Sequence, residues 1–278
     1  MSKSRINIDR QVLNDLYHGQ SLSPYKIGAL MNCSWATIAN RLREYKIPLK
    51  SGSAARIRYR RADFSGNLAE KAYMLGFRIG DLNVYSPTVH SETIVARCHT
   101  TQREQVDLIT RMFSDYGQST ISCNGRHLHV NCYLNQSFAF LLDKSESAWS
   151  WVDKSEKYFI PFMAGYADAE GNFIINQGKA RFKLDSYDLS VLKAITKWLA
   201  DIGVKYKFRQ IYKKNDVQYI RGFKSKYNGD LWRLNINEAA SLDKFILLIK
   251  PYLKHAIRIE QINICLENIE DRKINGTI

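Results

Sequence analysis

From residue 64 onward, the spacing of the apolar residues changes twice from the period of a helix to the two-residue period of a strand. Apolar helices near residues 73–81 and 162–173 open the two halves of this region. After the first helix, the pattern predicts two strands (residues 83–85 and 93–99) and a helix that ends at Gly117 (residues 103–116). A hairpin (residues 119–133) and a short helix (residues 138–142) follow.

The second half repeats this order over a longer stretch. Its predicted elements begin with two hairpin strands (residues 173–176 and 180–185) and a helix that ends at Gly203 (residues 187–202). Three further strands (residues 205–213, 219–227 and 231–236) and a helix (residues 238–249) follow. In the second strand, Arg181, Lys183 and Asp185 share one face while apolar residues share the other. Apart from the additional strand in the second half, each half is therefore expected to follow the order helix, two strands, helix, two strands, helix.

The two opening helices share small residues and a terminal acid. Gly76 and Gly80 fall on one side of the first helix, and Gly165 and Ala169 do the same in the second, because residues four apart are neighbours on a helix. Two such helices can pack with their backbones close together. Their final acids, Asp81 and Glu170, would then meet at one end of the pair and hold divalent metal ions. A buried helix pair without chemistry is the alternative for either copy taken alone.

These segments resemble the two signature helices of a monomeric LAGLIDADG homing endonuclease, and the resemblance covers residues 64–278. Residues 163–171 match the nine-residue motif closely; in residues 74–82, Ile79 replaces the first acid and Leu82 the final glycine, but Asp81 retains the second acid. The resemblance implies an α+β fold with two pseudo-symmetric αββαββα half-domains, residues 64–151 and 152–278, whose sheets form a saddle over DNA.

The activity that the resemblance implies is site-specific, metal-dependent cleavage of both DNA strands. It places Mg²⁺, with Mn²⁺ as an alternative ion, at Asp81 and Glu170, and at Gly80 and Ala169 just before them. The family also carries a basic residue late in each half. Lys144 and Lys254 stand at roughly corresponding places, and Arg258 competes with Lys254 for this role.

Strand residues are the candidates for DNA contact. Lys205, Lys207, Arg209 and Lys213 would share one strand face, which favours an anionic ligand over a merely solvated surface. The full set comprises Arg97, His99, His127, His129, Asn131, Arg181, Lys183, Lys205, Lys207, Arg209 and Lys213. The formal net charge of +14 agrees with a double-stranded DNA partner, whose target would be long and either pseudo-palindromic or asymmetric.

The first 50 residues predict three short helices that resemble a helix-turn-helix module. Ser23 and Ser34 are suited to cap the second and third helices. The expected core contains Ile27, Leu30, Ile38 and Leu42. The expected DNA-facing residues of the third helix are Trp35, Thr37, Asn40 and Arg41, with a plain three-helix packing module as the alternative. Residues 51–63 read as a basic linker whose arginines either follow phosphates or are solvated.

Composition narrows the compartment and the function. No apolar run approaches membrane-spanning length and the N-terminus lacks the pattern of a signal peptide, so we expect a protein of the cytoplasm or an organelle matrix, acting as a monomer. Five cysteines without a CxxC pair fit a reducing compartment. Two alternatives stay open: an intron maturase with an RNA partner, and a catalytically silent DNA-binding regulator, against which the retention of both acids argues.

Overall fold

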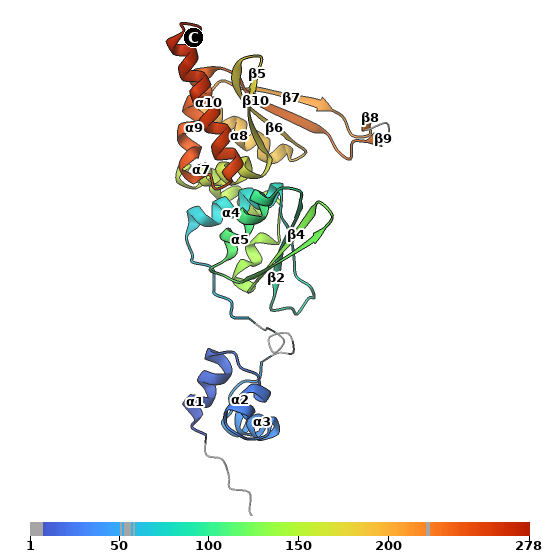
Figure 1. The fold of residues 1–278 in the computed structure, drawn as a ribbon, viewed down its shortest axis with the longest axis vertical. Coiled ribbons are helices and arrows are strands. Elements are labelled where there is room, and N and C mark those ends of the chain that lie inside the picture. The colour runs from blue at the N-terminus through green and yellow to red at the C-terminus, as the bar shows by residue number, and fades with distance from the viewer. Residues whose placement is uncertain (1–7, 51, 53–56, 58, 221–222) are drawn as a thin grey trace, which may run out of the picture.

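The computed structural model describes residues 8–50, 52, 57, 59–220 and 223–278 (Figure 1). The chain is an α+β protein that contains two four-stranded antiparallel sheets. Its buried apolar side chains form two separate cores, one within residues 8–47 and one within residues 72–269. No helix of the described residues has the length and apolar character needed to cross a membrane.

The N-terminal unit contains α1 (Arg10–Asn14), a π-helical turn (Asp15–Gly19), α2 (Pro24–Leu30) and α3 (Trp35–Glu44). Ser23 and Ser34 accept hydrogen bonds from the backbone N–H groups three residues later, as the sequence predicts for helix caps. Ile27, Ile38 and Leu42 are buried, as predicted. The prediction for Leu30 is wrong: this side chain is 65% exposed, and Leu13 and Tyr17 from the first helical segment fill the core instead.

The first half of the body consists of α4 (Leu68–Gly80), β1 (Asn83–Tyr85), β2 (Ile94–Thr100), α5 (Arg103–Phe113), β3 (Gln118–Asn124) and β4 (His127–Leu134). A 3₁₀ helix (Gln136–Leu141), α6 (Glu146–Trp149) and a second 3₁₀ helix (Ser150–Lys154) follow. The sheet has the order β1-β2-β4-β3. Gly125, with a φ of +59°, begins the tight turn between β3 and β4.

The second half consists of α7 (Glu156–Glu170), β5 (Gly171–Asn176), β6 (Lys179–Ser186), α8 (Leu189–Asp201), β7 (Lys207–Tyr212), β10 (Leu231–Ile236), α9 (Ala239–Ile249), a 3₁₀ helix (Lys250–Tyr252) and α10 (Ala256–Ile274). The sheet has the order β5-β6-β10-β7, which matches the order of the first half. Between β7 and β10 the chain forms a separate hairpin, β8 (Val217–Ile220) and β9 (Phe223–Lys226), which projects from the sheet in Figure 1.

This hairpin corrects the sequence prediction for residues 219–227, which do not form one strand of the main sheet. The register of β7 against β10 also shifts between Leu231 and Trp232, at a bulge. The bulge explains why Lys213, beyond the end of β7, is not in the alternation of that strand.

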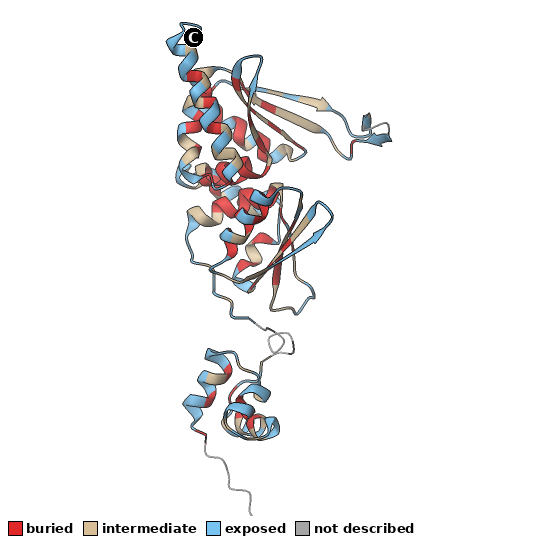
Figure 2. Cartoon of the chain, viewed as in Figure 1, coloured by how far each residue is buried: buried red, intermediate tan, exposed pale blue. Residues whose placement is uncertain are grey.

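The centre of the body is the contact between α4 and α7, which are buried in Figure 2. A Cβ atom on Gly76 would collide with the backbone carbonyl of Phe162, and one on Gly165 would collide with the carbonyl of Tyr73. The small residues predicted from the sequence therefore allow backbone-to-backbone contact between the helices. This contact fixes where the last residues of the two helices lie.

Candidate active site and nucleic-acid interface

The ends of α4 and α7 bring the two predicted acids together. A Cβ atom on Gly80 would lie 2.5 Å from Cβ of Ala169, 3.0 Å from Cγ of Glu170 and 3.4 Å from its Oε1. The Glu170 side chain thus lies over the backbone of Gly80, next to Asp81, which caps the end of α4. Both acids are half-buried.

Asp81 is held from the first half of the body. The buried Gln105 of α5 donates a hydrogen bond of 2.7 Å from Nε2 to Oδ2 of Asp81. Burial raises the pKa of Asp81 to about 6, while the bond from Gln105 and the charges of Arg258 and Lys144 oppose this rise. The carboxylate is therefore oriented, yet it retains unmet negative charge.

Glu170 has a second carboxylate neighbour that the sequence analysis missed. Burial raises the pKa of Glu170 to about 7, and the charges of Asp81 and Asp188 add to the rise. Asp188 precedes α8, and its backbone N–H donates to Oγ of Ser186, which in turn accepts a 2.7 Å bond from the Tyr166 hydroxyl. The negative charges of two acids, Asp81 and Asp188, thus act on Glu170 at this end of the helix pair.

Two cations oppose this negative charge, one from each half. Lys144 donates from Nζ to the carbonyl of Ile79 at 3.0 Å, at the end of α4. Arg258 of α10 is half-buried, and its charge lowers the pKa of both Asp81 and Glu170. Lys254 does not share this position: its Nζ lies 4.4 Å from the centre of the Tyr73 ring. Of these two residues, Arg258 is the one whose charge acts on both Asp81 and Glu170, whereas the carboxylates that act on Lys254 are Glu70 and Asp168.

The first motif acid of α7, Asp168, has a different environment from Glu170. It is fully buried, and its Oδ2 accepts hydrogen bonds from the Tyr73 hydroxyl at 2.5 Å, from the Lys254 N–H at 2.7 Å and from the His255 N–H at 3.2 Å. These two N–H groups immediately precede α10. Asp168 therefore fixes the start of the helix that carries Arg258, which makes it a positioning residue.

The donors at the site fit a hard divalent cation. Asp81 and Glu170 offer carboxylate oxygens, and the carbonyls of Gly80 and Ala169 belong to the last turns of their helices, where carbonyls lack partners within the helix. Among the described residues, no group of three or more His, Cys, Asp or Glu side chains could hold a metal ion. Mg²⁺ needs no such cage, because it commonly binds through one or two carboxylates and completes its shell with water and phosphate oxygens.

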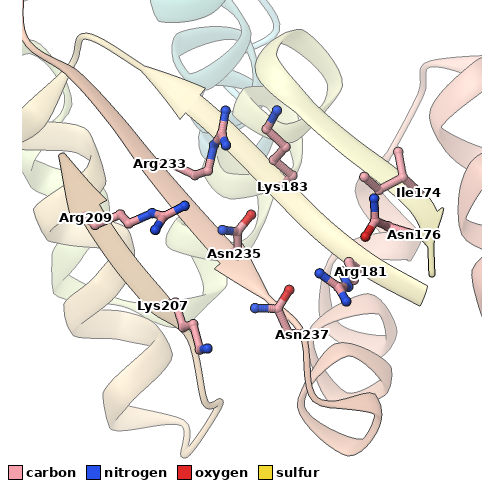
Figure 3. Close-up of a pocket in the computed structure, with 9 residues that line it drawn as sticks. All are labelled: Ile174, Asn176, Arg181, Lys183, Lys207, Arg209, Arg233, Asn235 and Asn237. Carbon is pink, nitrogen blue, oxygen red and sulfur yellow. The ribbon is translucent and has the colours of Figure 1, made fainter. Parts of the chain in front are cut away.

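The outer face of the second sheet is strongly cationic (Figure 3). It forms a groove lined by Ile174, Asn176, Arg181, Lys183, Lys207, Arg209, Arg233, Asn235 and Asn237. No ion pair or side-chain hydrogen bond within the described part of the chain engages Lys207 or Arg209. Lys205 lies before β7 and pairs with Glu238 at 2.6 Å, so the prediction that four cations share this face is correct only for Lys207 and Arg209.

The outer face of the first sheet is polar rather than cationic. Arg97 donates from Nε to Oδ1 of Asn131 at 2.8 Å and from Nη2 to the Tyr85 hydroxyl at 2.5 Å. His99 lies directly opposite His129, with ring centres 4.2 Å apart. His127 is exposed on the same strand, two residues from His129. The structure thus places all five predicted residues of this half on one face.

The N-terminal unit exposes part of its predicted contact set. Trp35 is 59% exposed and Asn40 is exposed, although Oδ1 of Asn40 accepts a bond from Arg43. Thr37 bonds to Ser34, and Arg41 pairs with Glu44 at 2.5 Å. Of the linker arginines, Arg56 and Arg58 lie outside the described residues. Arg61 belongs to the body, because its Nη1 donates to Oγ1 of Thr93 at 2.7 Å.

Comparison with known proteins agrees with this geometry. Residues 160–250 match the family model described as LAGLIDADG-like domain. An uncharacterized protein of Methanocaldococcus jannaschii, MJ0398, is 25% identical over 207 residues, which cover 72% of this chain and 73% of that protein. Residues 160–250 are therefore similar to a LAGLIDADG-like domain.

Two solved structures are similar to part of this chain. The structure of I-DmoI in complex with DNA and Mn is 16% identical and covers 66% of this chain and 97% of its own, with a TM-score of 0.45. The N-terminal LAGLIDADG domain of DUF199/WhiA is 14% identical and covers 66% of this chain and 82% of its own, with a TM-score of 0.41.

Several residues around the ends of α4 and α7 escaped the sequence analysis. Gln105 lies in α5 and Asp188 immediately precedes α8, and neither residue type stands out in an amphipathic pattern. The only signal for Asp188 was its place in the first turn of the helix predicted over residues 187–202, where an acidic residue is expected. Arg233 was missed because the strand containing it was not assigned to the DNA-facing surface.

Proposed function

We propose that this protein is a sequence-specific, metal-dependent endonuclease that cleaves both strands of duplex DNA. The observation that carries the proposal is the meeting of Asp81 and Glu170 at the ends of α4 and α7, with Lys144 and Arg258 beside them. A structural helix pair has no need for two half-buried acids whose pKa values are raised by burial.

The residues of the site divide the work of phosphodiester hydrolysis. Asp81 and Glu170 would hold Mg²⁺ or Mn²⁺, with help from the carbonyls of Gly80 and Ala169; the ion, when bound, supplies an activated water and stabilises charge on the phosphate. Gln105 orients Asp81. Lys144 and Arg258 would neutralise charge that develops on the phosphate and on the departing oxygen.

The substrate follows from the two sheet faces. Lys207 and Arg209 line the groove of the second sheet and have no ion-pair partner among the residues that the structure describes. Together with Arg97 and three histidines on the first sheet, they are suited to phosphates and base edges in a major groove. The N-terminal unit, with Trp35 exposed at the start of α3, would contact a second stretch of the same duplex.

A catalytically silent DNA-binding regulator is the second candidate, since the sheet surfaces would serve it equally well. The acid pair favours the enzyme, because a regulator gains nothing from the repulsion between the charges of Asp81 and Glu170. An RNA-binding maturase is a third candidate, but no feature of the described residues favours it.

Incubation of the full-length chain with a randomised duplex DNA library and Mg²⁺, followed by sequencing of the ends, tests the proposal. We expect ends at one preferred sequence, and none when EDTA replaces Mg²⁺. Specific binding without new ends would support the regulator. A protein that neither binds nor cleaves the library would exclude both functions. Arg209→Ala provides a check on the surface: we expect weaker binding with a smaller salt dependence.

A further inference from the structure

The two sheets carry a matched row of polar side chains that the proposed function does not by itself require. Asn83 follows Asp81 by two residues, and Asn172 follows Glu170 by two, so the two asparagines occupy equivalent places. Strand pairing extends each into a row across its sheet. The first row is Asn83, Arg97, Asn131 and Thr120, and the second is Asn172, Lys183, Asn235 and Lys207.

Both rows lie on the outer face of their sheet. Directly opposed residues on antiparallel strands point to the same side, and the residues adjacent to each row along its strands are mostly buried, among them Val84, Cys132, Phe173 and Leu234. Figure 3 shows Lys183, Asn235 and Lys207 of the second row side by side on β6, β10 and β7. The first three strands of each sheet thus present asparagine, cation, asparagine in the same order.

The neighbouring row, two residues away on each strand, differs between the halves. In the first sheet it contains His99, His129 and Ser122, and in the second Asp185, Arg233 and Arg209. Asp185 accepts two bonds from Arg233, from Nε at 2.6 Å and from Nη2 at 2.7 Å. The first sheet offers two imidazole rings and a hydroxyl where the second offers a carboxylate and two guanidinium groups.

We propose that the matched rows form equivalent nucleobase-binding subsites, in which Asn131 and Asn235 each donate to the N7 acceptor of a purine at symmetry-related positions of the target. The inference rests on the proposed DNA binding. A row of three side chains spans about 10 Å across the strands, which fits the roughly 12 Å width of a major groove.

The side-chain contacts support this assignment of the donor. Oδ1 of Asn131 already accepts a bond from Arg97, which leaves its Nδ2 group to donate. Within the described part of the chain, no hydrogen bond engages the Asn235 side chain, and it lies between Lys183 and Lys207 in the row. Purine N7 is the acceptor that adenine and guanine share in the major groove.

Selection of bound sequences tests the inference. The full-length chain, in EDTA so that the DNA stays intact, is mixed with a randomised duplex library, and the wild type is compared with Asn131→Ala, Asn235→Ala and Arg209→Ala. We expect the wild type to prefer the same purine at two symmetry-related positions. Asn131→Ala should lose about tenfold of the preference at one of them, and Asn235→Ala the same at the other.

Arg209→Ala is the matched control, because its counterpart in the first sheet is Ser122. Arg209→Ala should reduce the base preference at a position in one half-site only. At the symmetry-related position of the other half-site, the wild type should not prefer the same base. Two asparagine variants that relax unrelated positions, or that relax none while binding persists, would overturn the inference and leave the proposed function standing. A wild type that selects no sequence would overturn both.

Discussion

The Tyr73 hydroxyl donates a 2.5 Å hydrogen bond to Oδ2 of Asp168 and so joins α4 to α7 next to their crossing. The same oxygen accepts the N–H groups of Lys254 and His255, which begin the path into α10. One buried carboxylate oxygen therefore links both halves of the body to the helix that carries Arg258.

Asp168→Ala should lower the free energy of unfolding by about 3 kcal/mol, because it leaves a buried hydroxyl and two backbone N–H groups without a partner. Tyr73→Phe is the matched control, since it removes one of the three bonds and should cost about 1 kcal/mol. Urea denaturation measures both. Equal losses in the two variants would show that Asp168 does not hold the start of α10.

Arg258→Ala should reduce the rate of DNA cleavage about 100-fold with little change in binding, because a cation beside the acids acts on charge that develops during the reaction. Lys254→Ala should stay within a few-fold of the wild type, since its Nζ lies over the Tyr73 ring. Single-turnover cleavage with Mg²⁺ distinguishes them, and the opposite ranking would restore Lys254 to the site.

The acid pair also predicts a dependence of stability on pH in the absence of metal. A carboxyl whose pKa is raised on folding contributes stability that is fully present below its unfolded pKa and is lost as the pH rises through the folded value. For Glu170 this window runs from 4.5 to about 7. Relative to the wild type, Glu170→Gln in EDTA should gain about 3 kcal/mol at pH 8 and close to nothing at pH 4.5.

His255 shifts in the opposite sense, with a pKa lowered to about 4, chiefly by burial. Its contribution cancels in this comparison because both proteins contain it. A difference between wild type and Glu170→Gln that is the same at pH 4.5 and pH 8 would contradict the raised pKa. At pH 8, Mg²⁺ should stabilise the wild type more than the variant.

Strong local patterns made much of the body predictable. The spacing of Gly76, Gly80, Gly165 and Ala169 sufficed to predict the helix contact, since only close backbones require small residues at those positions. Alternation likewise identified the outward face of β6. These features depend on residues near one another in the sequence.

Features set by distant contacts were not predictable. Lys254 and Arg258 are four residues apart, one before and one within α10, and which of them reaches the acids depends on how Asp168 fixes the start of α10. The bulge opposite Leu231 placed Lys213 outside the strand, and residues of the first helical segment left Leu30 exposed. None of these contacts leaves a periodic signal in the sequence.

Deletion of residues 1–50 should shorten the DNA footprint at one end only and raise the Kd, because the N-terminal unit would act as a second, tethered contact. The cleaved bonds should not change, since both acids belong to the body, whose hydrophobic core is separate from that of the N-terminal unit. DNase protection and mapping of the cut ends measure these effects. An unchanged footprint and Kd would remove Trp35, Thr37, Asn40 and Arg41 from DNA recognition.

The central claim is that Asp81 and Glu170 form one metal-dependent active site, and cleavage of the selected DNA by Asp81→Asn and Glu170→Gln in Mg²⁺ tests it most directly. Each variant should lose cleavage by several orders of magnitude, on the scale of about 10³-fold or more, while its binding to the same DNA stays close to that of the wild type. Cleavage at the wild-type rate by either variant would contradict the claim.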